Sequence, residues 1–287
     1  MSVLRDFLGK YKEPVDRGIA EEMEKRLAEV REISPHLVPV LEAMKELSVG
    51  GKRLRAMLVI LGYQLSGHEV NSEVIKAAVV MEIFHLGLLI QDDFMDRDMT
   101  RRGVPTLIAR YDNPHVGNFV SMLAGDYTFG WGMEILSNLQ LPITNLQIIN
   151  GMRVWGKYFT RVGYGQTLDG LDIADDETIL KILAIKSGEY SCVLPLFLGA
   201  TLGGADKELL DRLEKIGMEL GWIFQLRDDY LGYEKDMAKK GKKTYATMYG
   251  KEKTQEAINQ HMELGRELAI GNGMIKELVE WLGTREN

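Results

Sequence analysis

Residues 82–102 combine an apolar segment with clustered carboxylates and a pair of arginines. In a helix, Asp92 and Asp96 lie four residues apart on one face, and Asp93 lies beside them, three residues before Asp96. Three carboxylates on one short face repel one another, and their hard oxygen atoms favour Mg2+ as the ion that relieves the repulsion. An acidic helix end in solvent is the alternative, but residues 88–90 are apolar, and a helix C-terminus favours cations over anions.

A second acidic pair repeats this arrangement. Asp228 and Asp229 follow an apolar stretch that contains Leu220, Trp222 and Phe224. If the two helices carry their aspartates at the same end, the space between them can hold more than one Mg2+ ion.

Basic residues form two candidate anion sites. Lys52 and Arg55 are three residues apart at the start of an expected helix, where backbone N–H groups add donors. A basic turn at the surface is the alternative, and the spacing is not that of a Walker loop. Arg101 and Arg102 suit phosphate oxygens because the guanidinium fork donates in pairs. Further positive charge could come from Lys186, Lys242 and Lys243. Together the acidic and basic residues predict a Mg2+-bound diphosphate beside a second anionic group.

The composition indicates a soluble globular protein. The chain has 287 residues, of which 45% are hydrophobic and 27% charged, enough for a substantial core. A net charge of -7 argues against a nucleic-acid partner, and the single cysteine, Cys192, requires no oxidising compartment. We expect no secretory signal and no transmembrane segment, because the apolar runs are shorter than a membrane span. The expected location is the cytoplasm.

Helical spacing of apolar residues dominates the chain, and no run alternates over the length of a strand, so we expect an all-α fold. The expected helices cover residues 6–32, 38–47, 53–65, 72 to the aspartate cluster, 117–138, 144–168, 177–199 and 206–231, with more helix after 245. Pro195 should kink the helix that contains it. No repeat or linker divides the chain, so residues 1–287 should form a single domain.

The motifs, taken in order, resemble those of the trans-type polyprenyl diphosphate synthases, a family that includes farnesyl and geranylgeranyl diphosphate synthases. The matching motifs are Gly50-Gly51-Lys52-Arg53-x-Arg55, Asp92-Asp93-x-x-Asp96, Arg101-Arg102-Gly103-x-Pro105-Thr106, Gly125-Asp126, Gly165-Gln166, Lys186-Ser187-Gly188 and Phe224-Gln225-x-x-Asp228-Asp229. The resemblance implies an isoprenoid-synthase-type bundle of helices around a central cavity. It also implies a prenyltransferase of isoprenoid biosynthesis, which condenses isopentenyl diphosphate with an allylic diphosphate by 1'-4 head-to-tail elongation.

The resemblance implies site residues by position. The Mg2+ ligands would be Asp92, Asp96 and Asp228, supported by Asp93 and Asp229, with three ions per site when substrates are bound. The diphosphate of isopentenyl diphosphate would be bound by Lys52, Arg55, His85 and Arg102. The allylic diphosphate would be bound by Arg101, Lys186 and Lys242, with Ser187 and Gln225 beside the reacting carbon. The expected catalytic residues are Asp92, Asp93, Asp96, Arg101, Lys186, Gln225 and Asp228. No protein general base is expected, because the departing diphosphate would take the proton.

Some of these residues also have structural interpretations. His85 could be a core histidine, although it lies seven residues before Asp92 on the same helical face. Gln166 and Asp169 could be ordinary polar packing, whereas the resemblance places them near the metal cluster. The chain departs from the family pattern at Gly232, where many members have an aspartate. It departs again in the short loop expected at 233–241, where only Lys235 and Lys239 could replace an allylic-site lysine. At Ser187 the commoner residue is threonine.

Product length is predicted from the residues one turn below the metal site. Leu88 and Gly87 precede Asp92 by four and five residues, which is roughly 6 to 7.5 Å along the helix at 1.5 Å per residue. Neither is an aromatic residue that would close a tunnel early. The expected product is therefore geranylgeranyl diphosphate or longer rather than farnesyl diphosphate.

Three other functions are compatible with parts of the sequence. A non-catalytic regulatory subunit of a heteromeric prenyl synthase is the main alternative. A terpene cyclase would leave Lys52, Arg55 and His85 without a purpose. A di-iron bundle would need a second Glu-x-x-His beside residues 82–85, and the sequence has none to complete it. The resemblance implies a homodimer built through the central helices, with a heteromer as the alternative.

Overall fold

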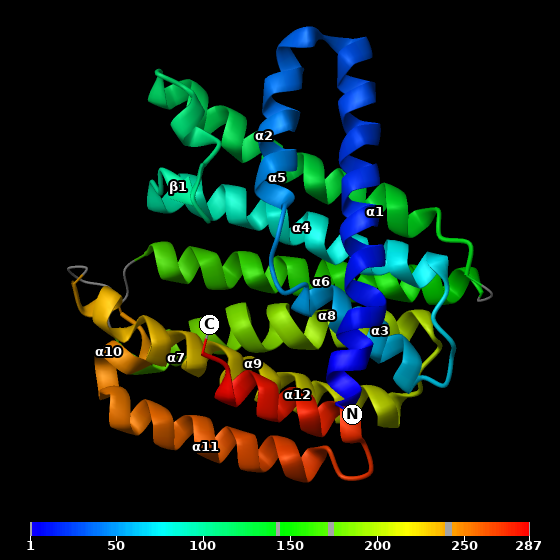
Figure 1. The fold of residues 1–287 in the computed structure, drawn as a ribbon, viewed down its shortest axis with the longest axis vertical. Helices are drawn as coiled ribbons and strands as arrows, with labels where there is room; N and C mark the ends of the chain where they lie inside the picture. The colour runs from blue at the N-terminus through cyan, green and yellow to red at the C-terminus, as the bar shows by residue number, and fades with distance from the viewer. Residues whose placement is uncertain (1, 142–143, 172–174, 239–242, 287) are drawn as a thin grey trace.

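The computed structural model describes residues 2–141, 144–171, 175–238 and 243–286, and helices make up nearly all of it (Figure 1). The helices in chain order are α1 (Val3–Ile33), η1 (Pro35–Leu37), α2 (Val38–Ser48), α3 (Leu54–Leu65), α4 (Ser72–Asp96), η2 (Ile108–Arg110), α5 (Pro114–Ser137), α6 (Asn145–Gly170), α7 (Asp176–Leu183), the π-helix η3 (Ala184–Val193), α8 (Leu194–Leu202), α9 (Lys207–Ala238), α10 (Tyr245–Tyr249), α11 (Lys251–Leu268) and α12 (Gly273–Thr284). The all-α prediction is confirmed.

The core helices lie in layers, and a hairpin of two helices crosses them. In Figure 1, α4, α5, α6, α9 and α11 run across the view, while α1 and α2 run nearly at right angles to them and project beyond the bundle. α4 packs against both α3 and α5, and α9 packs against η3 and α11. The interior is aromatic and aliphatic; Phe84 of α4 lies against Trp155 of α6, with ring centroids 5.0 Å apart. α4 is buried along most of its length, which explains its continuous apolar sequence.

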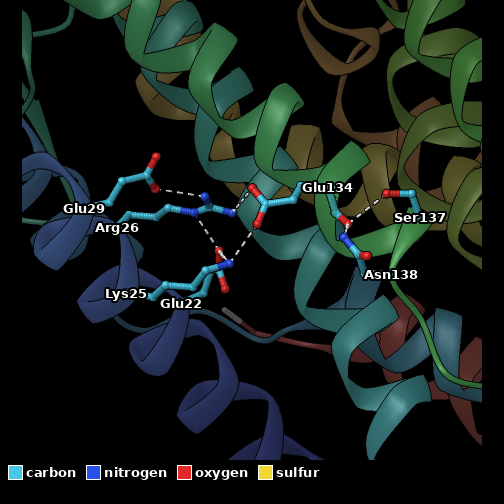
Figure 2. A network of polar contacts seen from close by, with 7 residues as sticks. All are labelled: Glu22, Lys25, Arg26, Glu29, Glu134, Ser137 and Asn138. Carbon is cyan, nitrogen blue, oxygen red and sulfur yellow. Dashed lines mark hydrogen bonds and ion pairs between the residues drawn. The ribbon is translucent and has the colours of Figure 1, made fainter. Parts of the chain in front are cut away.

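A network of ion pairs fixes the crossing of α1 over α5 (Figure 2). Arg26 of α1 is buried and contacts Glu22 at 2.7 Å and Glu29 at 3.0 Å on its own helix. It also contacts Glu134 of α5 at 2.9 Å. Burial opposes the charged form of Arg26, but the hydrogen bonds that it donates to Glu29 and Glu134 outweigh this effect and raise the pKa of the guanidinium. A buried arginine requires such compensation, so this contact specifies the angle of the hairpin.

A short β-hairpin with two residues in each strand follows α4, and the sequence did not predict it. β1 (Thr100–Arg101) pairs antiparallel with β2 (Val104–Pro105). The turn residues Arg102 and Gly103 both have positive φ, 51° and 83°, as in the tight turns of short hairpins. Strands this short leave no alternation in the sequence for a pattern to detect, although the Arg-Gly pair is a turn signal.

The helical stretch around Pro195 is divided rather than simply kinked. α7 continues into the π-helix η3, and Pro195 lies in the first turn of α8, where its missing N–H costs no hydrogen bond. Residues Asp176–Leu202 are long and apolar enough to cross a membrane by composition, but 67% of the most apolar part is buried in the fold. The core helix of a soluble protein has the same properties.

α9 extends further than the sequence indicated. It ends at Ala238 instead of Leu231, so most of the loop expected at 233–241 is helical and the prediction was wrong there. Lys235 lies on this helix. Residues 239–242, which include Lys239 and Lys242, lie outside the described residues.

Candidate active site

The first acidic cluster forms the last turn of α4. The helix ends at Asp96, and Arg97 closes it in the left-handed conformation, with φ of 58°. Asp93 is only 2% exposed, and its Oδ1 accepts hydrogen bonds from Arg101 Nε at 2.7 Å and Nη2 at 2.6 Å. Burial raises the pKa of Asp93, and Arg101 opposes that shift. Asp92 is half-buried and Asp96 exposed, so these two carboxylates face outward while Asp93 anchors the arginine.

Two polar contacts connect this cluster to α6 and to the π-helix. Gln166 Nε2 donates to Asp92 Oδ1 at 3.1 Å. One turn further along α6, Asp169 forms an ion pair with Lys186 of η3 at 2.7 Å. The structure therefore places Gln166 and Asp169 beside the predicted site residues instead of in separate packing contacts.

Two further contacts continue from the π-helix to the second acidic pair. Ser187 Oγ donates to Gln225 Oε1 at 2.6 Å, and Gln225 Nε2 donates to Asp229 Oδ1 at 2.7 Å. The backbone N–H of Tyr245 donates to the other oxygen of Asp229 at 2.8 Å. Burial raises the pKa of Asp229 to about 6 despite these hydrogen bonds. Segments far apart in sequence are thus joined in one polar layer across α4, α6, η3 and α9.

Asp228 lies next to the basic residues instead of deep in the helix packing. Its Oδ1 accepts from Arg285 Nη2 at 2.5 Å. Burial raises the pKa of Asp228, while the charges of Arg285, Lys52 and Arg55 lower it. The second acidic pair therefore faces two predicted anion-binding residues and one arginine that was not predicted.

A cavity of about 300 Å3 collects the basic side chains. It is lined by Lys52, Arg55, His85, Arg102 and Arg285, together with neighbouring residues of α1, α2, α3, α4 and α9. Arg55 donates to Ser191 Oγ at 2.6 Å, and its guanidinium lies over the ring of Tyr190. The Nε atoms of Arg55 and Arg285 are buried without a hydrogen-bond partner among the described residues. Buried N–H groups are rarely left unpaired, so an acceptor from outside the chain is expected here.

The charges in this cavity destabilise one another. Burial lowers the pKa of Lys52, and the charge of Arg285 adds to the effect. Burial likewise lowers the pKa of Arg102, with further contributions from Arg53 and Arg101. An anion in the cavity would relieve this repulsion.

His85 is held as a neutral ring. Burial lowers its pKa well below the usual value, and the charge of Arg55 adds to that effect. Its Nδ1 lies 3.3 Å from the hydroxyl of Tyr190. A neutral imidazole keeps one N–H donor and can therefore bind an anion without a net charge of its own.

Arg53 has a positioning role that the sequence did not reveal. It is 8% exposed and has a φ of 55°, and its guanidinium contacts Asp16 at 2.6 Å, the carbonyl of Ser48 at 2.8 Å and Glu82 at 3.4 Å. Glu82 also accepts from the backbone N–H of Ala56 at 3.1 Å, which satisfies a donor in the first turn of α3. The loop that carries Lys52 is therefore fixed to α1, α2 and α4. Glu82 serves this network, with no metal cluster around it among the described residues.

Glycines allow close approach at two points near the site. Gly51 has a φ of 99°, a conformation that other residues rarely adopt, and the guanidinium of Arg102 lies in ordinary contact with it. A Cβ on Gly87 would lie 1.9 Å from Thr128 Oγ1 of α5. Leu88, the other predicted length-determining residue, is half-buried. The roles of Gly87 and Leu88 in product length stay predictions, but any side chain at 87 must displace Thr128.

The acidic residues suit Mg2+ shared with a substrate more than Mg2+ held by protein alone. No three His, Cys, Asp or Glu side chains of the described part of the chain converge on one ion position. Mg2+ is usually bound by one or two carboxylates, with waters and substrate phosphates completing the shell. Asp92 and Asp96 at the end of α4 and Asp228 of α9 offer hard oxygen ligands of that kind, so the residues fit the ion.

Comparison with known proteins agrees with this geometry. Residues 38–263 match the family model described as polyprenyl synthetase. The geranylgeranyl diphosphate synthase of Saccharolobus solfataricus is 29% identical over 244 residues, 83% of this chain and 69% of that protein. The geranylfarnesyl diphosphate synthase of Aeropyrum pernix is 29% identical over 248 residues, 83% of this chain and 72% of that protein. The crystal structure of a geranylgeranyl pyrophosphate synthase from Corynebacterium glutamicum, complexed with isoprenyl diphosphate and magnesium, superposes with a TM-score of 0.84. It is 22% identical and covers 97% of this chain and 99% of that one.

The fold is the all-α fold of that geranylgeranyl pyrophosphate synthase. The chain belongs to the polyprenyl synthetase family. It is a trans-prenyltransferase, a polyprenyl diphosphate synthase, as the resemblance in the sequence had implied.

Proposed function

We propose that this enzyme condenses isopentenyl diphosphate with an allylic diphosphate and makes geranylgeranyl diphosphate or a longer product. The observation that carries the proposal is the basic cavity beside Asp228, where two buried arginine Nε groups lack a partner among the described residues. Isopentenyl diphosphate keeps its diphosphate during the reaction, so direct contacts with basic side chains suffice to bind it. The allylic diphosphate must leave, so it belongs beside the carboxylates that would hold Mg2+.

The proposed roles follow this division. The residues that would bind isopentenyl diphosphate are Lys52, Arg55, His85 and Arg102. The residues that would bind the allylic diphosphate are Arg101, Lys186 and, outside the described residues, Lys242. The Mg2+ ligands would be Asp92, Asp96 and Asp228, with three ions per site. Asp93 would act through Arg101, and Ser187 and Gln225 would border the reacting carbon through the contact between them.

The chemistry needs charge stabilisation and the exclusion of water. Mg2+, when bound, would neutralise the negative charge that develops on the departing diphosphate. Arg101, held by Asp93, presents its remaining donors to the same group. Apolar side chains of α4, α5 and α6 keep water from the allylic cation until the alkene attacks it. The proton that the product loses in the last step would go to the departing diphosphate, as the resemblance to the family implies. No side chain is proposed as a general base.

The test of this function is an assay of the purified protein alone. With Mg2+, isopentenyl diphosphate and an allylic starter, the dephosphorylated products should separate on a chromatogram as twenty-carbon alcohols or longer. Asp92→Asn should reduce turnover at least a hundredfold, whereas Asp211→Asn, which removes an exposed partner of Lys207, should not. Absence of any product from the protein alone would favour the alternative, a non-catalytic regulatory subunit of a heteromeric synthase.

A homodimer is proposed through α5 and α6. Large apolar side chains that are 44% to 62% exposed lie on these two helices, namely Phe119, Met122, Leu146, Ile149 and Tyr164. Large apolar side chains gathered on two helices can form an interaction site, and this is the basis of the proposed interface. Phe119→Glu with Ile149→Glu should give a monomer by light scattering, while Ile270→Glu, a change at a still more exposed site after α11, should leave the dimer intact. A wild-type monomer that gains mass only with another subunit would indicate a heteromer.

Two broader features complete the proposal. Residues 1–287 form one domain, and the enzyme acts in the cytoplasm without a membrane span. Limited proteolysis that released a stable fragment would contradict the first, and fractionation with membranes after a salt wash would contradict the second.

A further inference from the structure

The last helix delivers its C-terminal end to the active site. Glu277 of α12 accepts hydrogen bonds from Ser2 Oγ at 2.7 Å and from the backbone N–H groups of Val3 and Leu4 at 3.1 and 2.8 Å. These contacts join α12 to the beginning of α1. Four residues later, Trp281 lies under the ammonium group of Lys52. The position of the C-terminal residues is therefore set by the two ends of the chain together.

Arg285, the first residue after α12, is inserted between α9 and the basic cavity. Its side chain is 7% exposed, and its Nη2 contacts Asp228 Oδ1 at 2.5 Å and the carbonyl of Phe224 at 3.0 Å. The guanidinium also lies over the ring of Phe224, with 4.5 Å between them. Arg227 fixes the backbone by donating from Nε to the carbonyl of Arg285 at 2.8 Å. These four contacts show that Arg285 is held in place and is not a solvated surface residue.

Arg285 has two candidate anionic partners, Asp228 and an anion in the basic cavity. It neutralises Asp228, a proposed Mg2+ ligand, and at the same time it lines the cavity proposed for isopentenyl diphosphate. Its Nε is buried with no partner among the described residues, so the contact with Asp228 does not satisfy the side chain. The arginine is thus placed to serve either the carboxylate or an anion in the cavity.

We infer that Arg285 is the resident counter-cation of Asp228, that a divalent ion competes with it for this carboxylate, and that the released guanidinium binds the diphosphate in the basic cavity. This inference rests on the proposed function of the two sites. A guanidinium and a divalent ion on one carboxylate repel each other at short range, so binding of either weakens binding of the other. The guanidinium of Arg285 can therefore contact the diphosphate only when it no longer pairs with Asp228.

The competition can be measured without turnover. Mn2+ alone serves as the probe, and the electron paramagnetic resonance signal of the free ion reports how much is bound. Arg285→Gln should tighten Mn2+ binding about tenfold, the effect of losing one charge-assisted hydrogen bond to the ligand. Arg285→Lys, which retains the charge, should tighten it less. In an Asp228→Asn background, Arg285→Gln should have no effect.

The anion site is probed separately with inorganic pyrophosphate in EDTA. By calorimetry, Asp228→Asn should strengthen pyrophosphate binding because the guanidinium is then available, and Arg285→Gln added in that Asp228→Asn background should weaken it about tenfold. Arg266→Gln is the matched control, since it removes an arginine–carboxylate pair with Glu280 of the same α12 helix at the surface. This control should change neither affinity. Circular dichroism and the unfolding midpoint establish that each variant is folded.

The results separate this inference from the proposed function. If Arg285→Gln leaves Mn2+ affinity unchanged or lowers it, the exchange is refuted even in an enzyme that makes prenyl products. Equal pyrophosphate affinities for Arg285→Gln and Arg266→Gln, both in the Asp228→Asn background, would refute the anion contact. If Asp228→Asn binds Mn2+ as tightly as the wild type and the wild type forms no product, the proposed function is refuted, and the inference that rests on it is refuted as well.

Discussion

Replacement of Gly87 by alanine should destabilise the enzyme, although alanine is the better helix former. Gly87 lies inside α4, where α5 approaches closely. The Cβ of an alanine would lie 1.9 Å from Thr128 Oγ1 and 3.0 Å from the carbonyl oxygen of Gly125. Thr128 cannot turn away freely, because its hydroxyl donates to that same carbonyl at 2.7 Å. Ordinary contacts between such atoms need about 3.5 Å, so the two helices must separate or Thr128 must give up its hydrogen bond.

The expected loss follows from two opposing terms. Overpacking of a tight core costs about 1–3 kcal/mol. Replacing glycine by alanine inside a helix raises the free energy of unfolding by about 0.5–1 kcal/mol. The free energy of unfolding should therefore fall by about 1–2 kcal/mol for Gly87→Ala. In a Thr128→Ala background the main clash is gone, and the same change should cost less than about 0.5 kcal/mol, a coupling of about 1 kcal/mol or more.

Urea unfolding followed by circular dichroism, at one fixed protein concentration, measures these values. Gly9→Ala is the control, because Gly9 lies inside α1 with nothing within 4 Å of its Cβ position, and it should stabilise slightly. Equal effects of Gly87→Ala and Gly9→Ala would refute the packing argument. So would a Gly87→Ala cost that is unchanged by Thr128→Ala.

Three further predictions concern product length, the basic loop and pH. Leu88→Phe, at a half-buried position one turn below Asp92, should shift the chromatographic product distribution toward fifteen carbons with little change in the unfolding midpoint; an unchanged distribution would contradict the tunnel argument. Arg53→Gln should lower the free energy of unfolding by about 3 kcal/mol, because it leaves Glu82 buried without its cation, and should raise KM for isopentenyl diphosphate more than it lowers kcat; an equal change in both parameters would speak against positioning. The pKa of Glu277 is lowered from its ordinary 4.5, first by the hydrogen bond from the Leu4 N–H and then by Ser2, so its stabilisation is present above pH 4.5 and is lost as pH falls through the folded-state pKa. Glu277→Gln should therefore lower the melting temperature at pH 7, and the difference should shrink steadily as the pH falls below 4.5. A difference that stays constant over that fall in pH would contradict the assignment.

The fold class could be read from the sequence because it depends on local periodicity. Apolar residues recur with helical spacing over nearly the whole chain, and Asn71 and Ser34 mark helix ends through hydrogen bonds made within a few residues. Signals that act over one turn of helix survive in a linear sequence. The strands of the hairpin around Arg102 have two residues each, too few for an alternating pattern, and so the sequence did not predict them. At the far end of α9 no pattern indicated that the helix continues, and the predicted loop was wrong.

The family could also be read from the sequence, since acidic and basic motifs occur in a fixed order. What the motifs could not show is which side chains contact each other. The contacts of Gln166 with Asp92 and of Ser187 with Gln225 join residues 74 and 38 positions apart. Such pairs depend on how helices cross, which is set by packing over the whole core.

By itself, the sequence determined an all-α chain with two acidic clusters on apolar helices and enough basic residues for two anions. It wrongly placed the second cluster at a helix end, because α9 continues to Ala238. Only the tertiary structure decided that Arg53 fixes the loop that carries Lys52, that Gly87 faces α5, and that Arg285 forms an ion pair with Asp228. Each of these depends on two segments brought together from distant parts of the chain. A glycine or an arginine has the same local pattern wherever its partner lies, and so its role becomes visible only when the helices are packed.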